Sequence, residues 1–168
     1  LRGIGFREAL KEIAQRVGAS APKSKRATKA PRWKPILPVP DDAPAMTLSD
    51  SNLWHPDHRI APTKAWAYPD AQRRLLGYEV RFDFTVEGVA KKDVLPVTFG
   101  AWPDGRLGWR LKGMPVARPI YGLDVLADRQ DAAVLVVEGA KTADAARTIF
   151  PVLVTIAWPG GSDGVDKV

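Results

Sequence analysis

The chain has 168 residues, 45% of them apolar and 26% charged, which fits a globular protein with one ordinary core or a small subdomain plus part of another. It has no cysteine, so a disulfide framework and a thiolate zinc site are excluded. No apolar run approaches the roughly 20 residues of a membrane span, and no signal-peptide core opens the chain. We therefore expect a cytoplasmic protein without a membrane partner.

An amphipathic helix is predicted over residues 6–17 (FREALKEIAQRV), where apolar side chains recur at helical spacing between charged ones. Gly18 supplies a stop signal for this helix. No partner for its apolar stripe follows closely in the sequence. We expect residues 1–18 to be the end of an upstream module.

The net charge of +6 is concentrated in one segment. Residues 19–40 contain six basic residues and no acidic one, while the other 19 basic residues balance the 19 acidic ones. Because this segment is rich in Ala, Pro, Lys and Ser, we expect a linker over residues 19–44. Contacts from it to nucleic-acid phosphates would be independent of sequence and weakened by salt, although a solubilising linker is the alternative. The candidate nucleic-acid-binding residues are Lys23, Lys25, Arg26, Lys29, Arg32 and Lys34.

A β-rich subdomain is predicted over residues 45–128. Apolar residues alternate with polar ones over residues 78–84, which indicates a strand with one buried and one wet face. Runs at 95–102 and 107–111 flank a Pro-Asp-Gly turn and extend the pattern to an antiparallel meander. A short helix is expected at 123–127.

The pattern changes over residues 129–168. The continuous apolar run at 133–137 suits a parallel strand buried on both faces. A helix at 140–150 and a second buried strand at 152–158 complete a βαβ unit. The chain is therefore expected to have an α+β fold, with an antiparallel β-rich subdomain followed by a βαβ unit.

Glu138 and Gly139 stand at the carboxyl end of the first of these strands, where open α/β sheets place ligands. A carboxylate there can bind a divalent cation or exchange a proton. The structural alternative is an acid that caps the following helix or is stabilised by its dipole.

Several stretches resemble a known family. The sequences LVVEGAKTADAA and FPVLVTIAWPGG resemble the first motif of the Toprim domain in DNA primases of phages and mobile elements. YPDAQRRLLGYEVRFDF, GWRLKG and RPIYGLDVLA resemble the β-rich subdomain that precedes it, and GFREALKEIAQRVGA resembles the last helix of the zinc-ribbon module. The motif carries Ala140 where the phage type often has Glu.

The resemblance implies that residues 129–168 are the first part of a Toprim sheet and that Glu138 is its metal-associated acid or base in nucleotidyl transfer. It also implies a motif loop of Gly139, Lys141, Gly160 and Gly161. Primers would be made from nucleotides on single-stranded DNA with Mg²⁺ or Mn²⁺, alongside a replicative helicase. The family's downstream Asp-x-Asp is not matched by Asp163 and Asp166, so we expect this chain alone to be inactive.

Two other function classes stay open. One is a non-catalytic nucleic-acid-binding module, and the other is a Toprim nuclease or topoisomerase relative, which would need a tyrosine nucleophile. A phosphate loop is disfavoured because its two glycines are missing around residues 134–142.

His55 and His58 lack a third metal ligand nearby in the sequence, so we expect a surface loop there. The six tryptophans could stack on unpaired bases, but we favour core positions for them.

Overall fold

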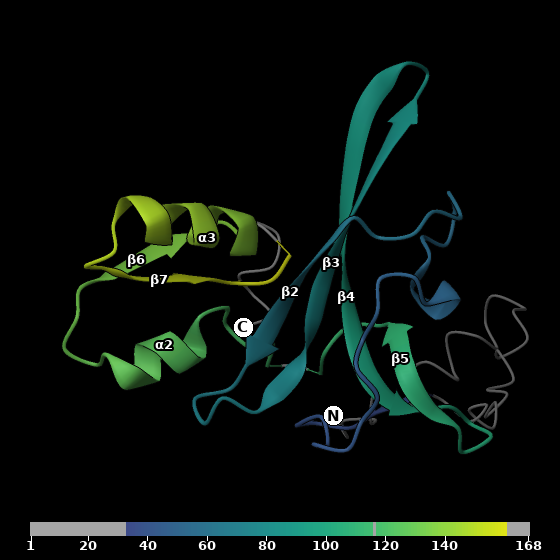
Figure 1. Cartoon of the computed structure of the whole chain (residues 1–168), viewed down its shortest axis with the longest axis horizontal. Helices are drawn as coiled ribbons and strands as arrows, with labels where there is room; N and C mark the ends of the chain where they lie inside the picture. Colours follow the sequence, from purple (N-terminus) through teal and green to yellow (C-terminus); the bar gives the residue numbers. More distant parts are fainter. Residues whose placement is uncertain (1–32, 116, 161–168) are drawn as a thin grey trace, which may run out of the picture. The chain divides into compact units, whose positions relative to one another are not determined.

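A computed structural model describes residues 33–115 and 117–160. Over these residues the chain is a mixed α+β protein with a mostly antiparallel sheet and few helices (Figure 1). The predicted helix at 6–17, five of the six basic linker residues and Gly161 lie outside the described residues. No helix in the described part of the chain is long and apolar enough to cross a bilayer.

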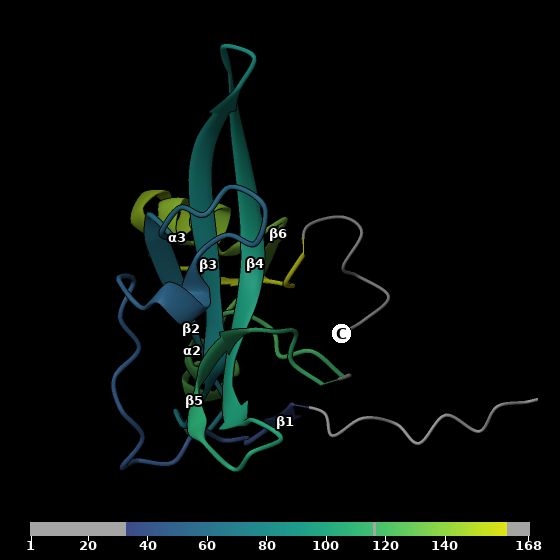
Figure 2. The ribbon, with the colours of Figure 1, turned by 90° about the vertical axis from the view of Figure 1, so that its right-hand side faces the viewer.

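The antiparallel sheet is built around the long hairpin of β3 (Leu75–Val86) and β4 (Val89–Ala101). β2 (Lys64–Pro69) pairs with β3, while β1 (Lys34–Pro35) and β5 (Leu107–Leu111) both pair with the last part of β4. Figure 2 shows β1 and β5 beside this end of β4. The predicted antiparallel meander is therefore confirmed, and its β4–β5 connection contains the expected Pro-Asp-Gly turn.

Alternation along β3 and β4 directs one set of side chains into the main core. Val80, Phe82, Val97 and Phe99 are buried there beside Trp109 of β5. The 3-10 helix η1 (Ser51–Leu53) contributes the fully buried Leu53 to the same cluster.

The end of the predicted linker belongs to this sheet and its core. Residues 34–35 form β1, and Val39 is buried in the main cluster. The backbone N–H of Val39 donates to the carbonyl of Leu75 at 2.7 Å. The linker was predicted through residue 44 from amino-acid composition. Composition alone does not reveal that a single apolar residue such as Val39 is buried against the end of a strand.

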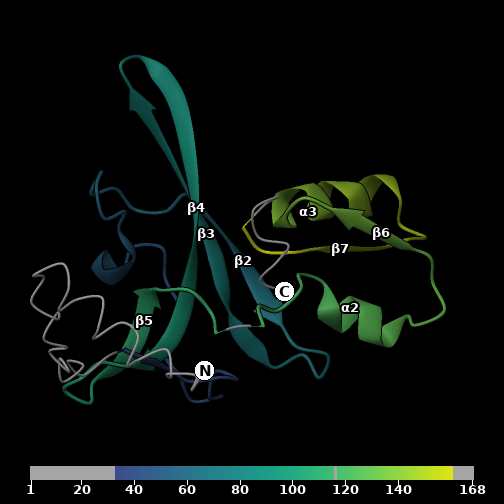
Figure 3. The same ribbon diagram turned by 180° about the vertical axis from the view of Figure 1, so that it is seen from behind.

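After α2 (Leu123–Asp128), the strands β6 (Val134–Val137) and β7 (Val154–Ala157) pair in parallel, with α3 (Ala140–Ile149) between them in the chain (Figure 3). The prediction that the first strand is buried on both faces is wrong, because Val134 and Val136 are 43% and 49% exposed. Among the described residues the parallel sheet has two strands, and the face of β6 that carries Val134 and Val136 is exposed.

A second core cluster joins α3 and β7 to the antiparallel sheet. It contains Trp66 and Tyr68 of β2 together with Tyr121, Ala143 and Ala157. Asp144 of α3 accepts hydrogen bonds from the Trp66 indole at 2.9 Å and from the Tyr121 hydroxyl at 2.7 Å. The partly buried bond from Trp66 ties α3 to β2.

Candidate functional site

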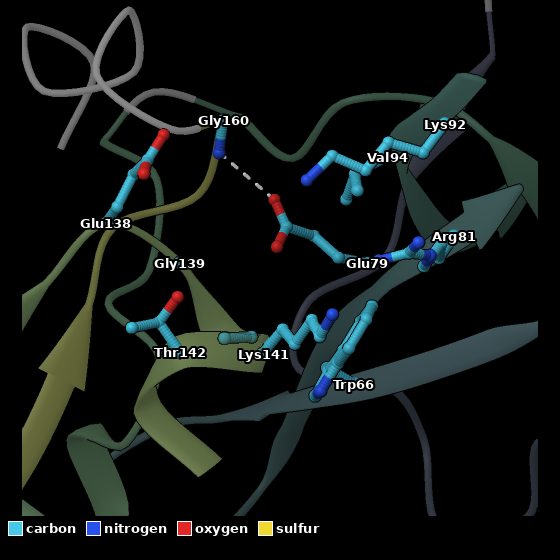
Figure 4. A pocket seen from close by; sticks show the side chains of 11 residues that line it. Trp66, Glu79, Arg81, Lys92, Val94, Glu138, Gly139, Lys141, Thr142 and Gly160 are labelled. Carbon is cyan, nitrogen blue, oxygen red and sulfur yellow. Dashed lines mark hydrogen bonds between the residues drawn. The ribbon is translucent and has the colours of Figure 1, made fainter. Parts of the chain in front are cut away.

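A cavity of about 300 Å³ lies where the carboxyl end of β6 and the start of α3 meet the antiparallel sheet (Figure 4). Its walls come from β2, β3, β4, the β6–α3 junction and the loop after β7. The lining residues are Trp66, Glu79, Arg81, Lys92, Val94, Glu138, Gly139, Ala140, Lys141, Thr142 and Gly160. The cavity thus contains four of the predicted site residues: Glu138, Gly139, Lys141 and Gly160.

Glu138 is exposed on the wall of this cavity. Gly139, not Glu138, is the N-cap residue of α3, and the helix start has no side-chain capping bond. Within the described part of the chain, the Glu138 carboxylate has no hydrogen bond or ion pair. The helix-capping alternative therefore has no contact to support it, and the carboxylate is free to meet a ligand.

Glu79 is the second carboxylate of the cavity, and the sequence pattern did not identify it. One of its oxygens accepts the Tyr68 hydroxyl at 2.5 Å, and the other accepts the backbone N–H of Gly160 at 3.1 Å. Burial raises the pKa of Glu79, although these two hydrogen bonds and the charge of Arg118 oppose the shift. The alternation of β3 placed Glu79 on the wet face, but the second core cluster covers that part of the strand.

Gly160 connects the loop after β7 to this buried carboxylate. Its φ of 87° lies in the left-handed region, where glycine carries no steric penalty. The Pro-Gly-Gly sequence after the last strand therefore holds one wall of the cavity through Glu79. Gly161, the other glycine of the predicted loop, is outside the described residues.

Three cationic side chains line the cavity. Arg81 is bound to Asp83, and this ion pair lowers the pKa of Asp83 to about 2, with smaller contributions from Thr63 and Lys141. Lys92 and Lys141 are exposed and make no ion pair with the described residues. Figure 4 shows their side chains reaching into the cavity from opposite walls. The Lys92 and Lys141 side chains therefore add positive charge to the walls of the cavity that Glu138 also lines.

The described residues do not by themselves fit a magnesium centre. No group of three or more Asp, Glu or His side chains among them is arranged to hold a metal ion. Both oxygens of Glu79 already accept hydrogen bonds, so among the described lining residues Glu138 is the carboxylate open to a cation. A divalent ion here would need further oxygen ligands from outside the described residues.

Lys34 and the two histidines, which are among the described residues, do not line this cavity. Lys34 begins β1. His55 is buried, its Nδ1 accepts the backbone N–H groups of Asp57 and His58 at 3.2 Å, and its Nε2 lies 3.0 Å from Asp93. The histidine pair therefore organises a loop, with His55 packed inside it.

The tryptophans and tyrosines divide between core and surface. Trp66 and Trp109 are buried, as favoured, whereas Trp54 is 37% exposed. Trp102 and Trp158 are half-buried. Tyr68 and Tyr121 are buried and donate to carboxylates, and no tyrosine lines the cavity.

Comparison of the chain with known protein families, curated proteins and solved structures finds no match. Functional inference therefore depends on the motif and on the geometry of this cavity.

Proposed function

We propose that the chain is part of a primase-like nucleotidyl transferase of the Toprim type, acting on nucleotides and single-stranded DNA. The observation that carries the proposal is the exposed Glu138 at the carboxyl end of β6, directly before α3, in a cavity that Lys92 and Lys141 also line. The Glu-Gly and Pro-Gly-Gly motifs that suggested this class both contribute to the same cavity. The βαβ unit would then be the opening unit of a Toprim sheet.

Each cavity residue has a distinct role in this proposal. The ammonium groups of Lys92 and Lys141 would bind nucleotide phosphates, with the first N–H groups of α3 as further donors. Glu138 would accept or hold a proton near the reacting oxygen. Glu79 would act indirectly by fixing the Gly160 loop. Mg²⁺ or Mn²⁺ would supply charge neutralisation at the phosphates, with further ligands from outside the described residues.

The decisive variant is Glu138→Gln, tested in the longest form of the protein that its gene encodes. The substitution keeps the size of the side chain but removes its charge and its ability to take a proton, so primer synthesis on a single-stranded template should fall by about 100-fold or more. Glu87→Gln is the matched control, because Glu87 is exposed at the β3–β4 turn and does not line the cavity. Melting curves of both variants should match the unsubstituted protein. Full synthesis by a folded Glu138→Gln protein would remove Glu138 from the reaction.

One observation favours the second candidate function, a non-catalytic nucleic-acid-binding module. Among the described residues the cavity pairs free lysines with too few carboxylates for a metal site. In that case Lys92→Gln and Lys141→Gln would weaken DNA binding. The unsubstituted protein would synthesise no primers, so Glu138→Gln would have no effect on synthesis. The nuclease or topoisomerase alternative gains no support, since burial raises the pKa of both Tyr68 and Tyr121 and disfavours the nucleophilic phenolate.

A further inference from the structure

A pair of aromatic rings lies at the end of the antiparallel sheet formed by β1, β5 and the last residues of β4. Trp33 directly precedes β1 and Trp102 directly follows β4. Their ring centroids are 4.7 Å apart at an interplanar angle of 78°. Both side chains are half-buried, so part of each ring is open to solvent.

Both rings are held in place by the sheet. The Trp33 indole donates to the hydroxyl of Thr98 at 3.3 Å. Trp102 lies directly against Gly108, where an added Cβ would be 2.8 Å from the ring. A glycine at this position therefore lets the indole rest on the backbone of β5, and the pair is positioned before any ligand arrives.

The ring pair is on the face of the sheet opposite the main core. Thr98 and Arg110 are register partners on β4 and β5, while their neighbours Phe99 and Trp109 belong to the core cluster. Successive side chains of a strand alternate between faces, so Thr98 and Arg110 point away from that core. The surface shares no residue with the cavity around Glu138.

Arginines lie over both rings. The guanidinium of Arg110 is 5.9 Å from the Trp33 centroid, and that of Arg106 is 5.4 Å from the Trp102 centroid. Arg106 is paired with Asp104, but Arg110 has no carboxylate partner among the described residues. Arg110 is therefore available for a phosphate.

The charged side chains on the strand segments around this pair of rings are all positive. The strands β1 and β5 and residues 97–102 contain no acidic residue, and the exposed Lys34 of β1 and Lys112, directly after β5, add positive charge. The acid nearest to them in the sequence, Asp104 in the turn between β4 and β5, is paired with Arg106. In the sequence, Lys34, next to Trp33, is the last basic residue of the acid-free segment 19–40. Positive side chains beside exposed aromatic faces are the elements with which proteins bind single-stranded nucleic acid.

We propose that Trp33, Trp102, Arg106 and Arg110 form a binding surface for single-stranded nucleic acid, in which unpaired bases stack on the two indoles and Arg110 contacts a phosphate. This surface goes beyond the proposed function, since it binds without metal, nucleotide or Glu138. Duplex DNA, whose bases are already stacked on each other, presents no free base faces to the rings and should bind more weakly.

The test measures the affinity of the full chain for a fluorescein-labelled oligothymidylate of about 16 nucleotides and for its duplex, by fluorescence anisotropy. Trp102→Leu should weaken single-strand binding by about fivefold or more, as expected for the loss of one stacked base. Arg110→Gln should weaken it and lower the slope of log K against log salt by about 0.7. Trp33→Leu should act like Trp102→Leu where its melting curve shows a folded protein.

Matched controls are Trp54→Leu and Arg59→Gln, both exposed side chains outside this surface. They should leave the affinity unchanged. Since every variant keeps the basic segment, binding through that segment alone would leave Trp102→Leu and Arg110→Gln at the unsubstituted affinity, and that result would overturn the proposal. Equal affinity for duplex would also overturn it. An inactive protein that still depends on Trp102 for binding would reject the primase proposal and keep this one.

Discussion

Glu79 illustrates how the surroundings of one residue change its chemistry. In the strand pattern it belongs with Arg81 and Asp83 on a wet face, yet it is 5% exposed whereas Asp83 remains exposed. The difference arises because the second core cluster reaches the first half of β3 and not the second half. Tertiary packing of this kind has no local signal, so the sequence could predict the strand but not the buried carboxylate.

The raised pKa of Glu79 predicts a pH effect on stability. A carboxylate whose folded-state pKa is raised binds its proton more tightly in the folded protein, so stability is highest at low pH and falls as pH rises from the ordinary value of 4.5 through the folded-state pKa. Glu79→Gln removes this component. The difference in free energy of unfolding between the unsubstituted protein and Glu79→Gln, from urea titrations over about pH 4 to 7, should therefore shift toward the variant as pH rises.

Acids with lowered pKa values, such as Asp83 and Asp104, act in the opposite direction but are present in both proteins. Their contributions to the free energy of unfolding therefore cancel when the unsubstituted protein is compared with Glu79→Gln. Parallel stability curves across this pH range would mean that Glu79 titrates normally in the folded state.

At the scale of elements, local signals located some boundaries well and others poorly. The strand at 107–111 agrees with β5 and the helix predicted from residue 140 agrees with the start of α3. Both begin after a turn or a glycine that ends the preceding structure. In contrast, β4 begins at Val89 and not at residue 95, because VAKKDV shows no buried face and is a strand by virtue of its pairing with β3.

Asp144 is predicted to be the main polar contact between α3 and the antiparallel sheet. Its carboxylate accepts the Trp66 indole and the Tyr121 hydroxyl, and Arg147 lies 3.5 Å away. Asp144→Ala leaves both partly buried donors without an acceptor, which should lower the free energy of unfolding by about 1 to 3 kcal/mol in urea titrations. Asp131→Ala is the control, since Asp131 is exposed and makes no bond to the described residues. Equal loss in both variants would argue against this role.

At the scale of the whole molecule, the sequence predicted the succession of an antiparallel and a parallel part but not how they are joined. Residues 119–128 were assigned to the β-rich subdomain, yet Tyr121 forms an isolated bridge with Ala157 of β7. Such a contact depends on residues far apart in the chain. The same is true of the cavity, where the predicted Glu138 meets the unpredicted Glu79, Arg81 and Lys92 only through the joining of the two parts.

The uneven distribution of charge leads to the last prediction, which concerns DNA binding by the complete chain. All of the net charge of +6 comes from the acid-free segment, so its contacts to phosphates should contribute affinity that depends on salt and not on base sequence. Replacing Lys23, Lys25, Arg26 and Lys29 by Ser should lower the slope of log K against log salt for a single strand by up to about 3, since each phosphate contact contributes roughly 0.7. Anisotropy titrations at several salt concentrations measure this slope directly.

The matched control replaces four exposed basic residues outside the segment, Arg59, Lys91, Arg73 and Arg129. If both fourfold variants lose the same slope, the net charge of the protein and not this segment determines its attraction to DNA.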